Sequence, residues 1–348
     1  MTNVINHPRQ IFQSNEVCTA KTVYNVQHLV GSGRFSRVFH AIDSTTGQAV
    51  VIKALVLKEQ NSALDHYQFL KEVEIMKRLN RCSLRSRYAR LIDTVQLQTG
   101  VNCLIIERLG TTLQAVLHNV GALPMSVCRT VVRQIAQGLV GLKSMGIVHA
   151  DLKPDNIMFC ASICNNYLVK IIDFGWAFQM KDAKKMLFKK LQALSYRAPE
   201  VCFCGQLDHA LDIWALGCIM PEIVTGVKLF EVTDEEHLMR VITTVLPVPD
   251  YLSSDTPDRN FHAHQLSRGW QRFKCFSTGF AHVQNREDAE WFTDLVMKML
   301  SAMPDQRITA AEALSHPFLT MRHFIKYPNS SVTKSNVEIM TKCSVDIG

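Results

Sequence analysis

One short stretch, Ile147–Ile157, constrains this chain more than any other part of its sequence. It places a carboxylate (Asp151), an ammonium group (Lys153) and a carboxamide (Asn156) on one loop, and a second acid, Asp173, follows the apolar run 169–172. We interpret this spacing as a loop, a two-stranded ribbon and then an acid at the end of the ribbon. A base, a countercharge and two oxygen ligands for a metal ion are what phosphoryl transfer requires, because that reaction depends on positioning and charge neutralisation.

The region before this loop predicts a small β-rich unit. Alternating apolar residues bounded by turn signals predict five strands, and one amphipathic stretch predicts a helix over 64–79. The strands are expected from Tyr24 into the glycines at 31–33, and then at about 37–43, 48–54, 88–97 and 101–107. Residues 1–22 are polar and unpatterned, so we expect a flexible N-terminal arm there.

A glycine-rich hairpin follows the first expected strand. Gly31 and Gly33 would let backbone amides approach phosphate oxygens without a Cβ in the way, although Ser36 stands where a third glycine would complete the pattern. A dinucleotide-binding fold would need a helix directly after this loop. Because the loop runs instead into strand residues at Val38, we set that fold aside.

Lys53 is a cation in an otherwise apolar strand. It could simply occupy a strand edge, or it could hold the phosphates of a nucleotide with the help of a carboxylate. Glu72 is the best candidate for that carboxylate, because Ile75, Met76 and Leu79 follow it at helical spacing. Glu74 would point to a different face.

The chain changes character after about Glu107–Gly110, which we expect to be a hinge. Apolar residues from Val127 to Leu142 predict a long amphipathic helix leading into the loop at Asp151. Further helices are expected at 208–226, 234–244, 288–300 and 309–314, with an irregular insertion at 247–287. The predicted fold class is α+β, with an N-terminal β unit at 23–109, a mainly helical unit at 110–320 and a C-terminal extension at 321–348.

Composition narrows the function classes. The net charge of +7 comes without a run of five or more basic residues, so it is general surface charge and predicts no nucleic-acid binding. The 11 cysteines are scattered, and no apolar stretch approaches the length of a signal sequence or membrane span. We therefore expect an intracellular protein with reduced thiols and no membrane partner.

These motifs, together with Ala198–Glu200, Asp212–Gly217 and Arg307, resemble those of eukaryotic protein kinases over about 24–320. Within that family, His149–Pro154, Leu246–Leu252 and His316–Met321 are similar to the homeodomain-interacting protein kinases, in the branch of the dual-specificity tyrosine-regulated kinases. The resemblance implies a two-lobed kinase fold, a small five-stranded lobe with one helix, and serine/threonine specificity. It also implies protein substrates, including transcription regulators, a nuclear or cytoplasmic location, and a monomer.

The resemblance also implies ATP and Mg²⁺ as cofactors and assigns roles to single residues. Asp151 would accept or orient the proton of the substrate hydroxyl, Lys153 would steady the transferred phosphoryl group, and Asn156 and Asp173 would hold the metal. The nucleotide would be bound by residues of the hairpin, strand, helix and hinge: Val30, Gly31, Gly33, Val38, Lys53, Glu72, Ile106, Glu107 and Leu109.

The segment after Asp173 departs from that family. Residues 174–194 contain no Ser, Thr or Tyr, so we hypothesise that activity does not require phosphorylation of this loop. Its five lysines could favour acidic substrates, although a solvated surface is the simpler interpretation. The replacements at Ser36, Ala193 and Leu194 leave open a second hypothesis, a catalytically weak kinase-like scaffold.

Overall fold

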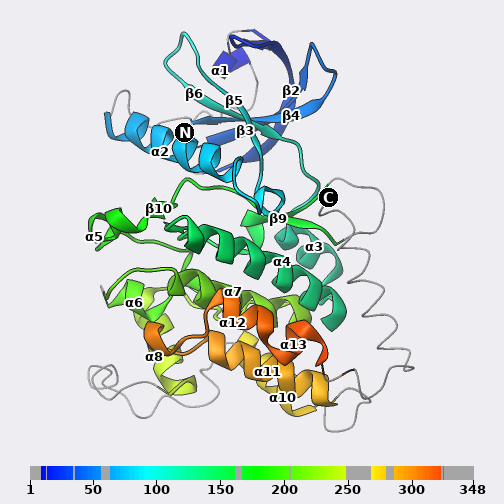
Figure 1. The fold of residues 1–348 in the computed structure, drawn as a ribbon, viewed down its shortest axis with the longest axis vertical. Coiled ribbons are helices and arrows are strands. Elements are labelled where there is room, and N and C mark those ends of the chain that lie inside the picture. The colour runs from blue at the N-terminus through cyan, green and yellow to red at the C-terminus, as the bar shows by residue number, and fades with distance from the viewer. Residues whose placement is uncertain are drawn as a thin grey trace. The chain divides into compact units, whose positions relative to one another are not determined.

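The computed structural model describes residues 9–12, 14–33, 36–55, 63–160, 167–203, 205–247, 268–279, 286–322 and 324. The chain divides into two compact units. One contains residues 1–110 together with 173–175, and the other contains residues 111–172 and 176–348 (Figure 1).

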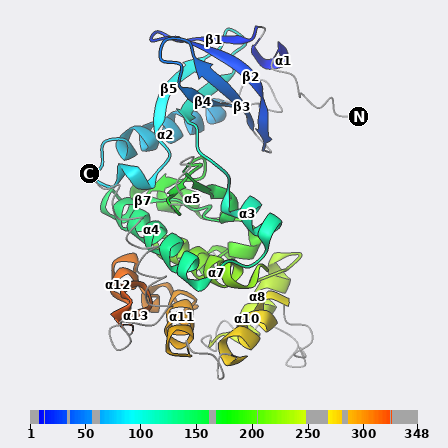
Figure 2. The ribbon, with the colours of Figure 1, turned by 90° about the vertical axis from the view of Figure 1, so that its right-hand side faces the viewer.

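The N-terminal unit is built on a six-stranded antiparallel sheet with the strand order β1-β2-β3-β4-β6-β5 (Figure 2). Its strands are β1 (Glu16–Cys18), β2 (Val23–Ser32), β3 (Ser36–Asp43), β4 (Ala49–Leu55), β5 (Leu91–Gln96) and β6 (Asn102–Glu107). Burial alternates along β4, where Val50, Ile52 and Ala54 are buried and the residues between them are partly exposed. This period of two covers one face of the sheet with a hydrophobic core and turns Lys53 to the other face.

Helix α2 (Ala63–Leu79) contacts β5 and β6, and the short 3₁₀ helix η1 (Arg85–Arg87) follows it. Phe69, Val73, Met76 and Leu79 are buried on one side of α2 at spacings of three and four residues. Glu72 lies on this buried side, whereas Glu74 is exposed.

The structure corrects the expectation that residues 1–22 form a flexible arm. Residues 9–18 contain helix α1 (Arg9–Phe12) and strand β1, which pairs with β2 and adds a sixth strand to the five predicted. Ile11 and Phe12 are buried, and the Phe12 ring packs edge-on against Phe39 with centroids 4.9 Å apart. These apolar segments are too short to show a period, which is why the sequence pattern missed them. Residues 1–8 lie outside the described part of the chain.

The C-terminal unit is mainly helical. Its helices are α3 (Leu113–Val120), α4 (Met125–Ser144), α5 (Ala183–Met186), α6 (Pro199–Cys202), α7 (Ala210–Thr225), α8 (Glu235–Val245), α10 (Arg268–Gly279), α11 (Arg286–Met299), α12 (Ala310–Ser315) and α13 (Pro317–Thr320). Helix α7 is buried along almost its whole length and forms the centre of this unit. Two short antiparallel pairs complete it, β7 (Ile147–Val148) with β10 (Phe178–Gln179) and β8 (Ile157–Phe159) with β9 (Val169–Ile171).

The interpretation of 247–287 as an irregular insertion is wrong for helix α10. Trp270 of α10 stacks on Phe230 with ring centroids 6.2 Å apart, and Phe230 stacks on Trp214 of α7 at 6.0 Å. The helix approaches so closely that a Cβ on Gly269 would be 1.6 Å from the carbonyl oxygen of Lys228. Residues 248–267 and 280–285 lie outside the described residues.

The remaining expectations concern the C-terminus, the cysteines and the membrane. Of the expected extension at 321–348, only residues 321, 322 and 324 are described, and the Phe324 ring lies 5.3 Å from the Arg129 guanidinium. Within the described ranges the cysteines are free thiols. No helix in those ranges is both long and apolar enough to span a membrane.

Candidate active site

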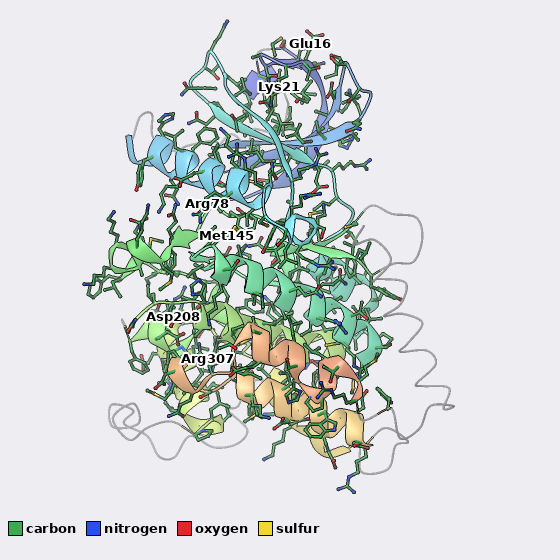
Figure 3. The ribbon with its side chains drawn as sticks, in the orientation of Figure 1. Glu16, Lys21, Arg78, Met145, Asp208 and Arg307 are labelled. Carbon is green, nitrogen blue, oxygen red and sulfur yellow. The ribbon has the colours of Figure 1, made fainter. Side chains whose placement is uncertain are left out.

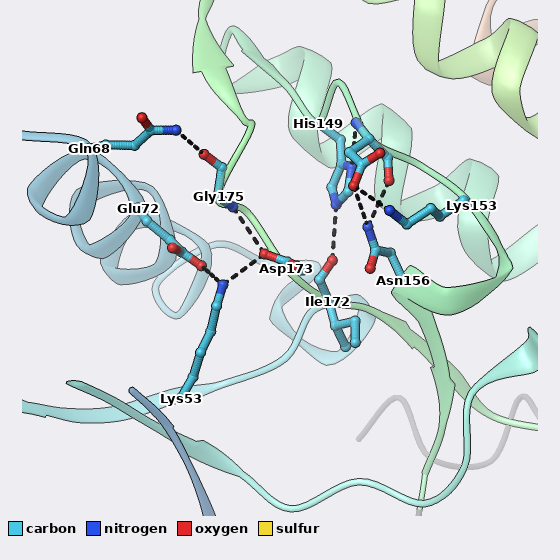
Figure 4. A network of polar contacts seen from close by, with 10 residues as sticks. Lys53, Gln68, Glu72, His149, Lys153, Asn156, Ile172, Asp173 and Gly175 are labelled. Atoms are coloured by element: carbon cyan, nitrogen blue, oxygen red, sulfur yellow. Dashed lines mark hydrogen bonds and ion pairs between the residues drawn. The ribbon is translucent and has the colours of Figure 1, made fainter. Parts of the chain in front are cut away.

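The N-terminal unit contains an ammonium group held by two carboxylates. Lys53 Nζ on β4 lies 2.8 Å from Glu72 Oε1 on α2 and 2.8 Å from Asp173 Oδ1 (Figure 4). Burial alone would lower the pKa of Lys53, but the Asp173 and Glu72 carboxylates outweigh it and hold that pKa above its usual value. The lysine is therefore charged and fixed in position across the physiological pH range.

Backbone geometry around Asp173 fixes this arrangement. Asp173 has a φ of +61°, and the Gly175 amide donates to Asp173 Oδ1 at 3.3 Å. A Cβ on Gly175 would lie 3.3 Å from Asp173 Oδ1 and 3.9 Å from Lys53 Nζ, so the turn leaves little room for a side chain. Gln68, one helical turn before Glu72, donates from Nε2 to the Gly175 carbonyl at 3.1 Å.

The glycine-rich hairpin joins β2 and β3. Gly31 pairs with Val38, and the Gly33 amide donates to the Ser36 carbonyl at 2.9 Å. Val30 is 53% exposed, although it is a large apolar residue. Ser36 has no positive φ, so the absence of a third glycine creates no backbone strain at that position. Residues 34 and 35, at the tip of the hairpin, lie outside the described residues.

The expected hinge begins at the end of β6. Ile106 pairs with Val51 of β4, and Glu107 pairs with Val50. The Glu107 amide donates to the Arg90 carbonyl at 3.0 Å, and Glu107 Oε1 accepts from the Arg90 amide at 2.7 Å. Leu109 follows as a half-buried residue outside regular structure. Ile106 and Glu107 are thus fixed by the sheet.

The C-terminal unit contains the second group of polar side chains. Lys153 Nζ lies 2.8 Å from Asp151 Oδ2, and Asn156 Nδ2 donates to the Asp151 carbonyl oxygen at 2.8 Å and to Asp151 Oδ2 at 3.1 Å (Figure 4). Asn156 ends the 3₁₀ helix η2 (Pro154–Asn156), and its carbonyl accepts from the Ile172 amide at 3.0 Å. Residue 172 directly precedes Asp173 in the chain.

Two buried side chains hold the Asp151 loop in place. Asp212 of α7 accepts from the amides of His149 and Ala150 at 2.8 Å and 2.9 Å, where Ala150 has a φ of +62°. The Asp151 amide donates to His149 Nδ1 at 3.2 Å, so the proton resides on Nε2, which lies 3.0 Å from the Ile172 carbonyl. His149 therefore links the loop to the strand that ends before Asp173.

The segment between Asp173 and α7 is tied to the helical unit at two points. Arg197 donates to the carbonyls of Leu191 and Gln192 at 2.9 Å and 2.8 Å and forms an ion pair with Glu235 of α8. Glu200 is buried and accepts two hydrogen bonds from Arg307, at 2.7 Å and 3.0 Å. Figure 3 shows Arg307 among the helices of this unit.

Known proteins are similar to this chain over most of its length. The family described as the protein kinase domain matches residues 24–319, which is most of the chain. The chain belongs to the protein kinase family.

The kinase relatives include those expected from the sequence. Homeodomain-interacting protein kinase 2 of Mesocricetus auratus is 31% identical over 374 aligned positions, which cover 96% of this chain and 31% of that protein. The DYRK-family kinase pom1 of Schizosaccharomyces pombe is 28% identical, over 88% of this chain and 28% of its own length. The chain spans about a third of the length of the curated relatives it matches.

A solved crystal structure of a kinase domain is similar to this chain with a TM-score of 0.69 at 20% identity. The match covers 88% of this chain and 97% of that one. The predicted α+β kinase fold, with a β-sheet lobe and a helical lobe, is confirmed.

The donor groups of this kinase domain suit nucleotide and magnesium. No group of three or more His, Cys, Asp or Glu within the described ranges could hold a metal ion alone. Mg²⁺ does not need such a group, because it is usually held by one or two protein oxygens together with phosphate oxygens and water. Asp173 offers a carboxylate that is 42% exposed, and Asn156, whose Nδ2 faces Asp151, offers the carboxamide oxygen. Both are hard ligands of the kind Mg²⁺ prefers.

Two positioning residues of the kinase domain were missed as members of the site. From the sequence, Asp212 is named only within the motif Asp212–Gly217, and Gln68 is not named. A signal for Gln68 existed, because it precedes Glu72 by four residues on a helix and so shares its face. No local signal could show that Asp212 binds the Asp151 loop, because that contact joins residues about sixty positions apart.

Proposed function

We propose that this chain is a serine/threonine protein kinase that transfers the γ-phosphoryl group of ATP to protein hydroxyls with Mg²⁺. The observation that carries the proposal is Lys53 Nζ fixed between the carboxylates of Glu72 and Asp173. Such a group can neutralise phosphate charge without reorganising during the reaction. Asp151 on its ordered loop supports the assignment of a base.

The nucleotide roles follow from position within the N-terminal unit. Gly31 and Gly33 would present backbone amides to phosphate oxygens, and Lys53 would contact the phosphates while Glu72 holds it. Val30, Val38 and Ile106 would line the adenine, and the backbone from Glu107 to Leu109 would hydrogen-bond to it. We propose that residues 23–109 and 110–320 form the two lobes of the domain and that residues 321–348 form a C-terminal extension.

The chemical roles belong to the loop and its neighbours. Asp151 would accept or orient the proton of the acceptor hydroxyl, and Lys153 would balance charge on the transferred group. When bound, Mg²⁺ would neutralise phosphate charge, with Asn156 and Asp173 as its protein ligands. Lys153 at this place favours serine and threonine over tyrosine by resemblance to the family.

We also propose that the enzyme needs no phosphate on the loop after Asp173. Residues 174–194 offer no acceptor hydroxyl, and the segment is already held by buried contacts of Arg197 and Gln192. Mass spectrometry of active protein would then find no phosphate within residues 174–200. A stoichiometric phosphate at Ser195 or Tyr196 on which activity depends would contradict this.

The natural substrates and location are inferred from the relatives. Several of them are named homeodomain-interacting protein kinases, which suggests transcription regulators as substrates and the nucleus as one location. We propose that the domain acts as a monomer on such proteins and does not bind nucleic acid itself.

Transfer of radiolabelled phosphate from ATP to a peptide library tests the proposal. Wild-type protein should label serine and threonine peptides, whereas Asp173→Asn should not, because the carboxylate that binds both Lys53 and metal is lost. Equal background-level labelling by both proteins would favour a kinase-like scaffold over an enzyme.

A further inference from the structure

An exposed turn in the segment after Asp173 projects an aromatic ring into solvent. The turn follows α5, and the Lys189 amide donates to the Met186 carbonyl at 3.2 Å. Leu187 has φ −54° and ψ 143°, and Phe188 has a φ of +66°. These values describe a type II turn with Phe188 at the third position, where glycine is the usual residue. We call residues 184–190 the loop tip.

Phe188 has this unusual backbone conformation although the residue is exposed to solvent. A positive φ is disfavoured for a residue with a large side chain, and Phe188 is 84% exposed. The turn is nevertheless anchored at both ends, because Met186 and Leu191 are buried and Arg197 donates to the Leu191 carbonyl at 2.9 Å. The loop tip is therefore a held projection with an apolar end.

Exposed lysines flank Phe188 in the sequence. Lys184, Lys185, Lys189 and Lys190 are all exposed, and Asp182 is the single acid in the sequence between Asp173 and Glu200. Asp182 pairs with Lys185 at 2.7 Å. Across the described stretches of the chain, the other three lysines of the tip form no ion pair. An apolar side chain among uncompensated cations is complementary to an acidic surface that also carries an apolar group.

We propose that the loop tip is a docking surface for an acidic segment of the protein substrate. Carboxylates of that segment pair with the tip lysines, and an apolar side chain of the same segment covers Phe188. This inference rests on the proposed kinase function and names the substrate class of the same enzyme.

Two features favour a substrate segment over other occupants. The tip is continuous with residues 191–200, which Arg197 and Glu200 fasten to the helical unit, and it belongs to the segment that follows Asp173, the proposed metal ligand. A second copy of the chain would bring like charges together if the same surface met itself, which is repulsive. An anionic membrane is the remaining candidate, and it is an arm of the test.

Binding of labelled peptides to the full chain tests the docking independently of catalysis. Three fluorescein-labelled peptides share one serine: an acidic peptide with several Glu and one Leu, the same peptide with Gln for Glu, and the same peptide with Asn for Leu. Fluorescence anisotropy at low salt should give about tenfold tighter binding of the acidic peptide than of its Gln counterpart. Added salt should remove most of that difference, because it screens exposed charges.

Two variants of the tip and one matched control locate the surface. The quadruple variant Lys184→Gln/Lys185→Gln/Lys189→Gln/Lys190→Gln should abolish the preference for the acidic peptide. Phe188→Gly keeps the turn, since glycine suits its φ, and should weaken binding of the Leu peptide about threefold to fivefold while leaving binding of the Asn peptide unchanged. Lys77→Gln/Arg81→Gln/Arg85→Gln/Arg90→Gln removes four exposed cations elsewhere and should keep the preference.

Several outcomes would overturn the docking surface. The first is that the control variant loses the preference for the acidic peptide as fully as the lysine variant of the tip does, which would mean that only net charge matters. Others are no preference at all, or binding of anionic phospholipid vesicles that depends on Phe188 while the acidic peptide is ignored. Phosphorylation of the same peptides separates the two proposals. If the chain phosphorylates the peptides without preferring the acidic one, only the docking surface is contradicted. If the chain binds the acidic peptide but phosphorylates none of the three, only the proposed activity is contradicted.

Discussion

At the scale of single residues, the position of Lys53 carries the account, because one ammonium group is shared by two carboxylates. Lys53→Met should lower kcat/KM for peptide phosphorylation by at least about 100-fold, since a preorganised cation at developing charge is typically worth that much. The check is radiolabelled transfer from ATP. Lys77→Met, the same change at an exposed position of α2, is the matched control and should stay near wild type. Activity of Lys53→Met above a tenth of wild type would contradict the assigned role.

Glu222 on α7 predicts a pH dependence of stability. Burial raises the pKa of Glu222 to about 7, although the hydrogen bond from the Tyr196 hydroxyl at 2.7 Å works in the opposite direction. The unfolded chain releases this proton near the ordinary pKa of 4.5, so between that pH and about 7 the folded state binds more protons. The stability contributed by Glu222 is therefore present at low pH and is lost as pH rises through 7, by on the order of 3 kcal/mol.

Urea unfolding of wild type and Glu222→Gln from about pH 5 to about pH 8 measures this effect. Gln keeps an acceptor for Tyr196 but does not titrate. The free energy of unfolding of wild type should fall relative to the variant across this range. Parallel curves would show that Glu222 has an ordinary pKa.

At the scale of elements, the buried pair of Glu200 and Arg307 links α6 to the segment before α12. Arg307→Met should destabilise the protein by about 3–5 kcal/mol, because it leaves a buried carboxylate without its countercharge. Adding Glu200→Gln to that variant should recover part of the loss, which urea unfolding would show. Arg286→Met removes an exposed pair with Glu290 and should change stability by less than about 0.5 kcal/mol. Equal effects at the two sites would contradict the structural role.

The docked N-terminal segment leads to a further prediction at this scale. Phe12 packs on Phe39 in the core of the sheet, so Phe12→Ala should lower the free energy of unfolding by about 3 kcal/mol. Asn15→Ala, at an exposed position between α1 and β1, is the control. A Phe12→Ala variant as stable as wild type in urea unfolding would support the original expectation of a flexible arm.

These elements also show what the sequence could predict. The long strands and helices follow from apolar periodicity, and helical register pointed to Glu72, which the structure places 2.8 Å from Lys53 while Glu74 is exposed. Segment α1–β1 and helix α10 were missed, because the burial of Phe12 and Trp270 depends on Phe39 and Phe230, distant in sequence. The contact of Asp212 with the Asp151 loop could not be predicted for the same reason, since tertiary contacts leave no local pattern in the sequence.

At the scale of the whole molecule, we expect the chain to bind nucleotide. This expectation rests on its membership of the protein kinase family and on the polar residues around Lys53 and around Asp151. The mammalian homeodomain-interacting protein kinases are about three times as long as this chain, so their names describe more protein than the domain seen here. The proposed activity must therefore be tested on this chain itself, beginning with the nucleotide.

The most direct test is calorimetric titration of the purified chain with a non-hydrolysable ATP analogue, with and without Mg²⁺, for wild type and Asp173→Asn. The account predicts binding with a Kd of roughly 1 μM to 1 mM that depends on Mg²⁺ and is weakened in the variant. Absence of nucleotide binding, or binding that neither Mg²⁺ nor Asp173→Asn alters, would contradict the central claim.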